Sequence, residues 1–127
     1  MTALNDPDLF RQQALIDGNW IDAASGKTVD VVDPASGGVI GTIPDLNRDE
    51  TRRAIEAAEK AFASFRRTTH AARAAMLEKW YGLILDHQED LARIMTLEQG
   101  KPLAEARGEI VYTASFVKWY AEEARRI

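Results

Sequence analysis

The spacing of apolar residues changes near residue 47, and this change constrains the fold of the 127-residue chain more than any other feature. Before that point, short apolar runs alternate with Gly, Pro, Asn and Asp, which is typical of short strands joined by turns. After it, apolar residues recur about every three to four positions, which is typical of amphipathic helices. We therefore expect an α+β unit without a second domain, in which a β-hairpin region over 1–46 precedes a helical region over 47–127.

The first region contains a clear hairpin signal. Asp17-Gly18 separates two short apolar runs, 14–16 and 19–21. An Asp-Gly pair readily adopts the positive φ angles that a two-residue type I′ turn requires, so these runs are expected to pair. The remaining signals are an alternating stretch over 29–31, a loop over 33–38 and a strand over 39–43 that Pro44 ends.

The second region contains start and stop signals for helices. Asn47 and Glu50 form a predicted capping box, because each side chain can bond to the backbone N–H of the other. Gly100 suits the left-handed residue after a helix, and a proline soon after it is well placed to open the next one. The expected helices begin near Asn47, Thr69, residues 86–89 and Pro102, and the last runs to about Arg126.

Three of these helices show distinct apolar faces. The first carries a single stripe of Thr51, Ala54, Ile55, Ala58, Ala61, Phe62 and Phe65. The second carries Met76, Trp80, Leu83, Ile84 and His87 on one face, widened by Leu77, Tyr81 and Leu85, so we expect neighbours on more than one side. The fourth has one face of Leu103, Ala106, Ile110, Ala114, Val117, Ala121 and Ala124, and another of Tyr112, Phe116 and Trp119 or Tyr120.

Two apolar faces require two neighbours for the fourth helix. Gly108 lies in its interior, where glycine costs about 1 kcal/mol relative to alanine. This glycine indicates a close approach, either by another segment or by a ligand. Simple close packing is the interpretation that we favour.

Composition excludes several functions. The absence of cysteine removes a thiol nucleophile, a Cys-ligated metal and a disulfide. A net charge of −4 argues against nucleic acid as a partner, and no apolar run is long enough for a signal peptide or a membrane span, so we expect a cytoplasmic protein. The two histidines lie outside any metal-ligand pattern. Neither a phosphate-binding loop nor a G-x-G-x-x-G turn is present, and the residues alone show no catalytic constellation.

Several motifs nevertheless follow one another in a recognisable order. They are the stretches 15–20 (LIDGNW), 32–37 (VDPASG), 95–106 (MTLEQGKPLAEA), 108–110 (GEI) and 119–124 (WYAEEA). This series resembles the N-terminal part of aldehyde dehydrogenases. The stretches 10–14 (FRQQA) and 122–126 (EEARR) are similar to the succinate-semialdehyde branch of that family. Asp17 and Asp33 stand where the family more often has Asn, a departure that affects only turns.

The resemblance implies the start of the NAD(P)-binding domain of a larger α/β enzyme. In that family a Cys thiolate attacks a small aldehyde, hydride passes to NAD or NADP, and a Glu activates the water that releases the acid. Both catalytic residues belong to parts of the family pattern beyond this segment. We therefore expect the chain alone to be inactive and to bind no cofactor, the choice between NAD and NADP remaining open. The complete enzyme is expected to be a homo-oligomer, and the chain by itself to self-associate.

The resemblance also implies a role for one helix face. In this family the helix after the GKP turn borders the substrate tunnel, and the matching residues here are Gly108, Tyr112 and Phe116. Plain packing against the rest of the enzyme is the alternative explanation for this face. A second hypothesis for the whole chain is a stand-alone helical interaction domain derived from an aldehyde dehydrogenase.

Overall fold

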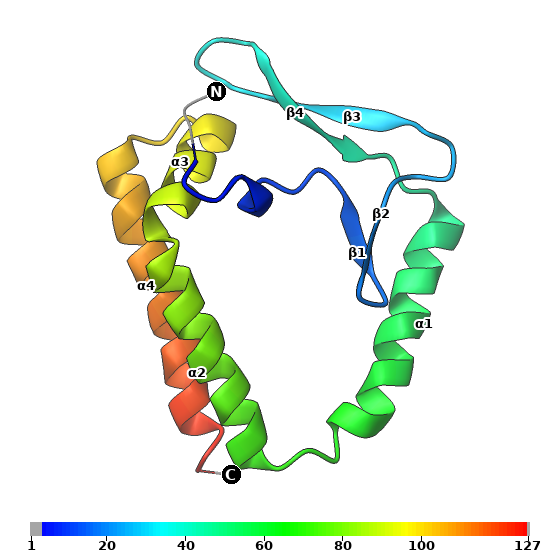
Figure 1. Ribbon diagram of the computed structural model, residues 1–127, viewed down its shortest axis with the longest axis vertical. Helices are drawn as coiled ribbons and strands as arrows, with labels where there is room; N and C mark the ends of the chain where they lie inside the picture. The colour runs from blue at the N-terminus through cyan, green and yellow to red at the C-terminus, as the bar shows by residue number, and fades with distance from the viewer. Residues whose placement is uncertain (1–3, 127) are drawn as a thin grey trace. The chain divides into compact units, whose positions relative to one another are not determined.

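The computed structural model describes residues 4–126, in which two β-hairpins precede a series of helices (Figure 1). The order is η1 (Pro7–Leu9), β1 (Ala14–Ile16), β2 (Asn19–Ile21), β3 (Thr28–Val32), β4 (Val39–Pro44), α1 (Arg48–Phe65), α2 (His70–Asp86), α3 (Gln88–Gln99) and α4 (Leu103–Glu123). This order confirms the predicted α+β arrangement. The chain forms two compact units: Phe10–Arg67 holds the hairpins and α1, and residues 68–126 form the other together with residues 4–9.

The hairpins of the first unit follow the predicted turns. Asp17 and Gly18 have φ angles of 51° and 76°, as a type I′ turn requires, and β1 pairs antiparallel with β2. β3 pairs antiparallel with β4, with an irregularity between Val31 and Val32. Pro44 lies inside β4 rather than after it, opposite Thr28. A proline is tolerated here because β4 is an edge strand of a two-stranded sheet. The pairing continues one residue further, where the Asp45 N–H donates to the Lys27 carbonyl at 2.9 Å.

The predicted capping box starts α1. The Asn47 side chain accepts the N–H of Glu50 at 3.0 Å, and Glu50 Oε2 accepts the N–H of Asn47 at 2.8 Å. The second oxygen of Glu50 accepts the N–H of Ala24 at 2.7 Å. These backbone hydrogen bonds, that of Ala24 foremost, lower the pKa of Glu50, whose residue is only 4% exposed. The carboxylate therefore ties the segment after β2 to the start of α1, whereas Ile55, Phe62 and Phe65 of the apolar stripe are exposed.

In the second unit, α4 packs along both α2 and α3, and α2 and α4 lie side by side in Figure 1. The core consists of Ala92, Ala106 and Ile110, packed against Ile84, Leu91, Met95 and Leu103. The buried residues of α4 are Ala106, Ile110, Ala114 and Ala121, all on the predicted face. Small residues on this face let neighbouring helices approach closely.

The prediction for α2 was wrong for part of its first face, although Ile84 of that face packs against the core as expected. Met76, Trp80 and Leu83 are exposed, whereas Leu77 and Tyr81 are half-buried. α2 is apolar around most of its circumference, so its sequence did not distinguish the side that α4 covers. Among the described residues α2 packs mainly on α4, with a smaller contact to α3.

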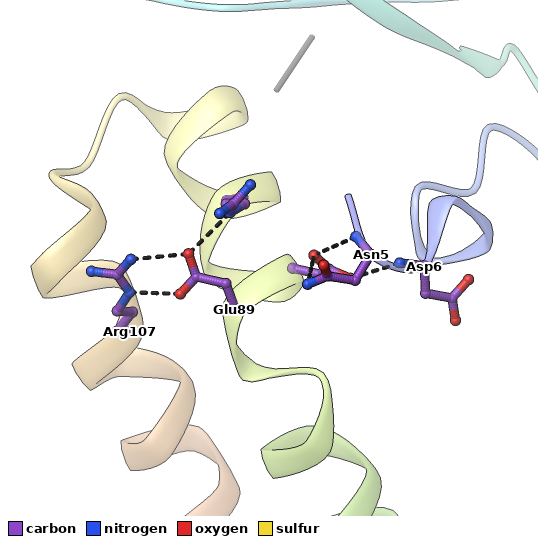
Figure 2. Close-up of polar contacts among 6 residues, drawn as sticks. Asn5, Asp6, Glu89 and Arg107 are labelled. Atoms are coloured by element: carbon purple, nitrogen blue, oxygen red, sulfur yellow. Dashed lines mark hydrogen bonds and ion pairs between the residues drawn. The ribbon is translucent and has the colours of Figure 1, made fainter. Parts of the chain in front are cut away.

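Residues 5 and 6 are bonded to α3. The N–H groups of Asn5 and Asp6 donate to the Asp90 carboxylate at 3.0 and 2.8 Å, and the Asn5 amide adds a bond at 3.2 Å (Figure 2). Asp90 is 2% exposed and belongs to the first turn of α3. At the other end of α3, Gly100 adopts the predicted left-handed conformation with φ 79°. Pro102 then directly precedes α4.

Candidate functional site

The three predicted site residues lie on one open face of α4. Gly108, Tyr112 and Phe116 follow one another at intervals of four residues, which places them on the same side of a helix. They line a shallow apolar depression that Glu109, Thr113 and Val117 complete. Tyr112 is 64% exposed and Phe116 is 47% exposed. The three residues that the family resemblance indicates thus lie together on one exposed side of α4.

The two rings of this face are ordered against each other. Their centroids are 4.9 Å apart at an interplanar angle of 86°, an edge-to-face contact. The Ser115 hydroxyl donates to the Tyr112 carbonyl at 2.6 Å, on the same helix. Edge-to-face pairs add about 0.5–1.5 kcal/mol beyond the burial of the rings. The face is therefore a preformed aromatic surface rather than two independent side chains.

Gly108 itself has no close neighbour. A Cβ at this position would meet no heavy atom within 4 Å among the described residues, outside the local backbone of its own helix. The close packing that we expected there is thus absent from the described part of the chain. Packing within this structure does not explain why a glycine occurs inside α4.

Polar contacts hold the N-terminal turns of α4 from the side of α3. Glu89 accepts Arg107 through both oxygens, at 2.7 and 2.9 Å, and also accepts Arg93 at 3.0 Å (Figure 2). The hydrogen bond from Arg107, followed by that from Arg93, lowers the pKa of Glu89 to about 2. Gln88 donates to the Arg107 carbonyl at 3.0 Å, and Lys101 forms an ion pair with Glu109.

A second polar cluster holds the C-terminal half of α4. Lys118 donates to both oxygens of Glu78 in α2, each at 3.1 Å, and Arg125 reaches the same carboxylate at 3.1 Å. The bond to Lys118 is the main reason that the pKa of Glu78 is lowered, and the bond to Glu78 likewise raises the pKa of Lys118. Sequence reasoning missed this cluster and the Glu89–Arg107 pair. The local signals were the i,i+4 spacings of Glu89 with Arg93 and of Lys118 with Glu122.

The face of α4 is mainly apolar. Its polar groups are the Tyr112 phenol, Thr113 and the ion-paired Glu109, and no described neighbour pairs a nucleophile with a base there. Within residues 4–126, no cluster of His, Asp and Glu side chains is arranged to hold a metal ion. Nor does any helix in that range have the length and apolar character needed to cross a membrane.

The sequence of the chain matches known enzymes. The profile of the aldehyde dehydrogenase family matches residues 20–127. The chain is 56% identical over 124 residues to the NADP(+) succinate-semialdehyde dehydrogenase of Escherichia coli K12, and 58% identical over 124 residues to the glutarate-semialdehyde dehydrogenase of Pseudomonas putida KT2440. Each match covers 98% of this chain and 26% of the relative, so the chain spans about a quarter of their length.

The fold matches as well. The crystal structure of succinate-semialdehyde dehydrogenase from Burkholderia pseudomallei superimposes with a TM-score of 0.95 at 51% identity, covering 98% of this chain and 26% of that one. The hairpins and helices described above are therefore the arrangement that such enzymes contain at the matched segment. With the family profile matching most of its length, the chain belongs to the aldehyde dehydrogenase family.

Proposed function

We propose that this chain is the N-terminal segment of an NAD(P)-dependent dehydrogenase that oxidises succinate semialdehyde, or a closely related semialdehyde, to the carboxylate. The supporting observation is identity above 55% over 98% of the chain to relatives named for succinate and glutarate semialdehydes. These two substrates carry the same pair of end groups, an aldehyde and a carboxylate, and differ by one methylene. The substrate class therefore follows from the chemistry that the relatives share.

The covalent step belongs to other parts of such an enzyme. A thiolate that attacks the aldehyde requires a cysteine, and this chain has none. Its own residues instead shape a surface and hold helices in place. Purified alone, the chain is expected to produce no NAD(P)H from succinate semialdehyde; production above the blank would contradict this assignment.

The described residues do not fit a dinucleotide. The diphosphate of such a cofactor is bound where a glycine-rich turn leads from a parallel strand into the N-terminus of a helix. Here the turns at Asp17-Gly18 and at residues 33–38 each join antiparallel strands. We therefore assign the cofactor, NAD or NADP, to the remainder of the enzyme and derive no step through it.

Gly108, Tyr112 and Phe116 form, in our proposal, part of the wall of the substrate tunnel. The observation that supports this proposal is the open apolar face of α4, to which the rings of Tyr112 and Phe116 contribute. The test is Tyr112→Ala in the complete enzyme, with aldehydes of increasing chain length. We expect KM to rise by about tenfold for the longer aldehydes, because an apolar contact of this size discriminates to that extent, while kcat changes less.

The matched control is Trp80→Ala, which removes an aromatic ring that is 56% exposed on α2 and is not among the residues that line the α4 depression. This variant should leave KM unchanged for every aldehyde. An unchanged KM for Tyr112→Ala across the series would instead remove Tyr112 from the tunnel wall.

A stand-alone interaction domain is the second candidate. The observation that favours it is the exposed aromatic side of α4, which includes Trp119 at 59% and Tyr120 at 62% exposure. A reading frame that continues past codon 127 into dehydrogenase motifs would exclude it. A stop codon there, together with sharp two-state unfolding of a monomer, would favour it.

A further inference from the structure

Gly108 is the weakest point of α4. After proline, glycine is the least favourable residue in a helix interior, because its backbone loses the most conformational freedom. Apart from its two chain neighbours and the local helix backbone, no described residue has an atom within 4 Å of the position that its Cβ would take. Helix α4 nevertheless continues without interruption from Leu103 to Glu123. Core packing of Ala106 and Ile110 supports the helix on one side, and contacts of the residues next to Gly108 add to that support.

The two residues next to Gly108 are each bonded to side chains that lie outside α4. Arg107 forms two bonds to Glu89, at 2.7 and 2.9 Å, and its carbonyl accepts a third bond from Gln88 at 3.0 Å. On the other side of the glycine, Glu109 pairs with Lys101 in the turn between α3 and α4. Arg107 and Glu109 are thus bonded to different parts of the chain, one to α3 and the other to the turn before α4.

We infer that Gln88, Glu89 and Lys101 form a brace that keeps α4 helical across Gly108 and holds Tyr112 and Phe116 in position. The brace contacts Arg107 and Glu109, so it leaves the open face at Gly108, Tyr112 and Phe116 uncovered. Its role in orienting a substrate wall rests on the proposed function; its effect on the helix does not. The three brace residues are positioning residues and not catalytic ones.

The paired orientation of Arg107 and Glu89 makes this pair the main part of the brace. Two parallel N–H···O bonds fix the guanidinium in one plane, which a single ion pair does not. Glu89 also accepts Arg93 from the same helix, so its own side chain is held in place from α3 (Figure 2). Gln88 then adds a contact to the backbone of α4 rather than to a side chain.

Hydrogen exchange in the full-length protein that carries this chain tests the brace directly. In Glu89→Gln, the amides of residues 107–112 are expected to exchange about three- to tenfold faster, as the loss of charge-assisted bonds predicts. Lys101→Met, which breaks only the pair with Glu109, should accelerate the same amides by a smaller factor. Glu123→Gln is the matched control, because it removes an ion pair with Arg126 at the far end of α4.

A glycine substitution separates a brace from general stabilisation. Gly108→Ala makes the helix regular without help, so Glu89→Gln should accelerate exchange much less in that background. Unchanged exchange in both Glu89→Gln and Lys101→Met would overturn the inference. Equal acceleration with and without Gly108→Ala would also overturn it, because the contacts would then stabilise the unit as a whole.

Steady-state kinetics on the same variants keep the two proposals distinct. If the brace positions a substrate wall, Glu89→Gln raises KM for long aldehydes more than it lowers kcat, whereas the control Glu123→Gln leaves KM unchanged. Faster exchange with KM unchanged would retain the brace and reject the tunnel wall. A KM effect of Tyr112→Ala with exchange unchanged in the brace variants would reject the brace alone.

Discussion

The backbone N–H of Asp6 donates to Oδ2 of Asp90 at 2.8 Å, across 84 residues of sequence. Oδ1 of the same carboxylate accepts both the N–H and the side-chain amide of Asn5. Asp90 is almost fully enclosed, and the bond from Asn5, followed by that from Asp6, lowers its pKa. The Asp90 side chain therefore attaches the segment of Asn5 and Asp6 to α3.

Asp90→Asn should release this segment while the helices stay folded. An amide has only one accepting oxygen, so its NH2 group would face a backbone N–H that it cannot bind. We expect the Asn5 and Asp6 amides to exchange about tenfold faster, measured by NMR. The control is Asp86→Asn, at the exposed end of α2, which should leave both amides unchanged. Full protection in Asp90→Asn would show that other contacts hold the segment.

Glu89 should make the stability of the chain depend on acid pH. Its folded pKa of about 2 lies below the ordinary value of 4.5, chiefly because it accepts hydrogen bonds from Arg107 and then Arg93. A lowered folded pKa means that the stabilisation is fully present above about pH 4.5 and is lost as pH falls toward 2. Urea unfolding between pH 6 and 3 should therefore show a smaller loss of stability in Glu89→Gln than in the natural chain. Glu50, Glu78 and Asp90 also have lowered pKa values, so their contributions to stability are lost at acid pH in both proteins. An equal loss of stability with falling pH in the two proteins would contradict the assignment, because Glu89 would then add nothing to the loss.

Local sequence signals predicted the helices and strands of this fold, but they did not predict contacts between residues that are distant in sequence. The capping box of Asn47 and Glu50 spans three residues, and the left-handed Gly100 needs no partner, so both follow from sequence. The second role of Glu50, accepting the N–H of Ala24, depends on how β2 meets α1. The Glu89–Arg107 pair likewise depends on how α3 meets α4. No spacing rule encodes either contact.

The candidate site shows the same division. The family resemblance selected Gly108, Tyr112 and Phe116, and their spacing agrees with a shared face because a helix brings every fourth residue to the same side. The exposure of that face did not follow from spacing, since apolar residues at helical intervals ordinarily predict burial. What covers an apolar face depends on the whole assembly and not on the helix that carries it.

Two glycines should respond to alanine with opposite signs. At Gly41 a Cβ would lie 2.8 Å from the Phe10 ring and 2.9 Å from Gln12 Oε1, which accepts the Thr42 N–H. Gly41→Ala should therefore destabilise the chain by about 1–2 kcal/mol through overpacking. At Gly82, in α2, a Cβ would meet nothing within 4 Å, so Gly82→Ala should stabilise by about 0.5–1 kcal/mol. Urea unfolding of both variants measures the difference, and a neutral Gly41→Ala would show that the Phe10 ring moves aside without cost.

The aromatic side of α4 should make the chain self-associate when it is purified alone. Tyr112, Phe116, Trp119 and Tyr120 each expose between 47% and 64% of their surface, and contiguous apolar patches of this kind favour association and dye binding. We expect ANS fluorescence to increase when the folded chain is added to the dye. We also expect the sedimentation coefficient to rise with protein concentration. Replacing Tyr112 and Phe116 together by Ser should weaken both effects, whereas Tyr112→Phe, which keeps the ring, should preserve them. A chain that remains monomeric at all concentrations and does not enhance ANS fluorescence would show that this face is stable in water without a partner.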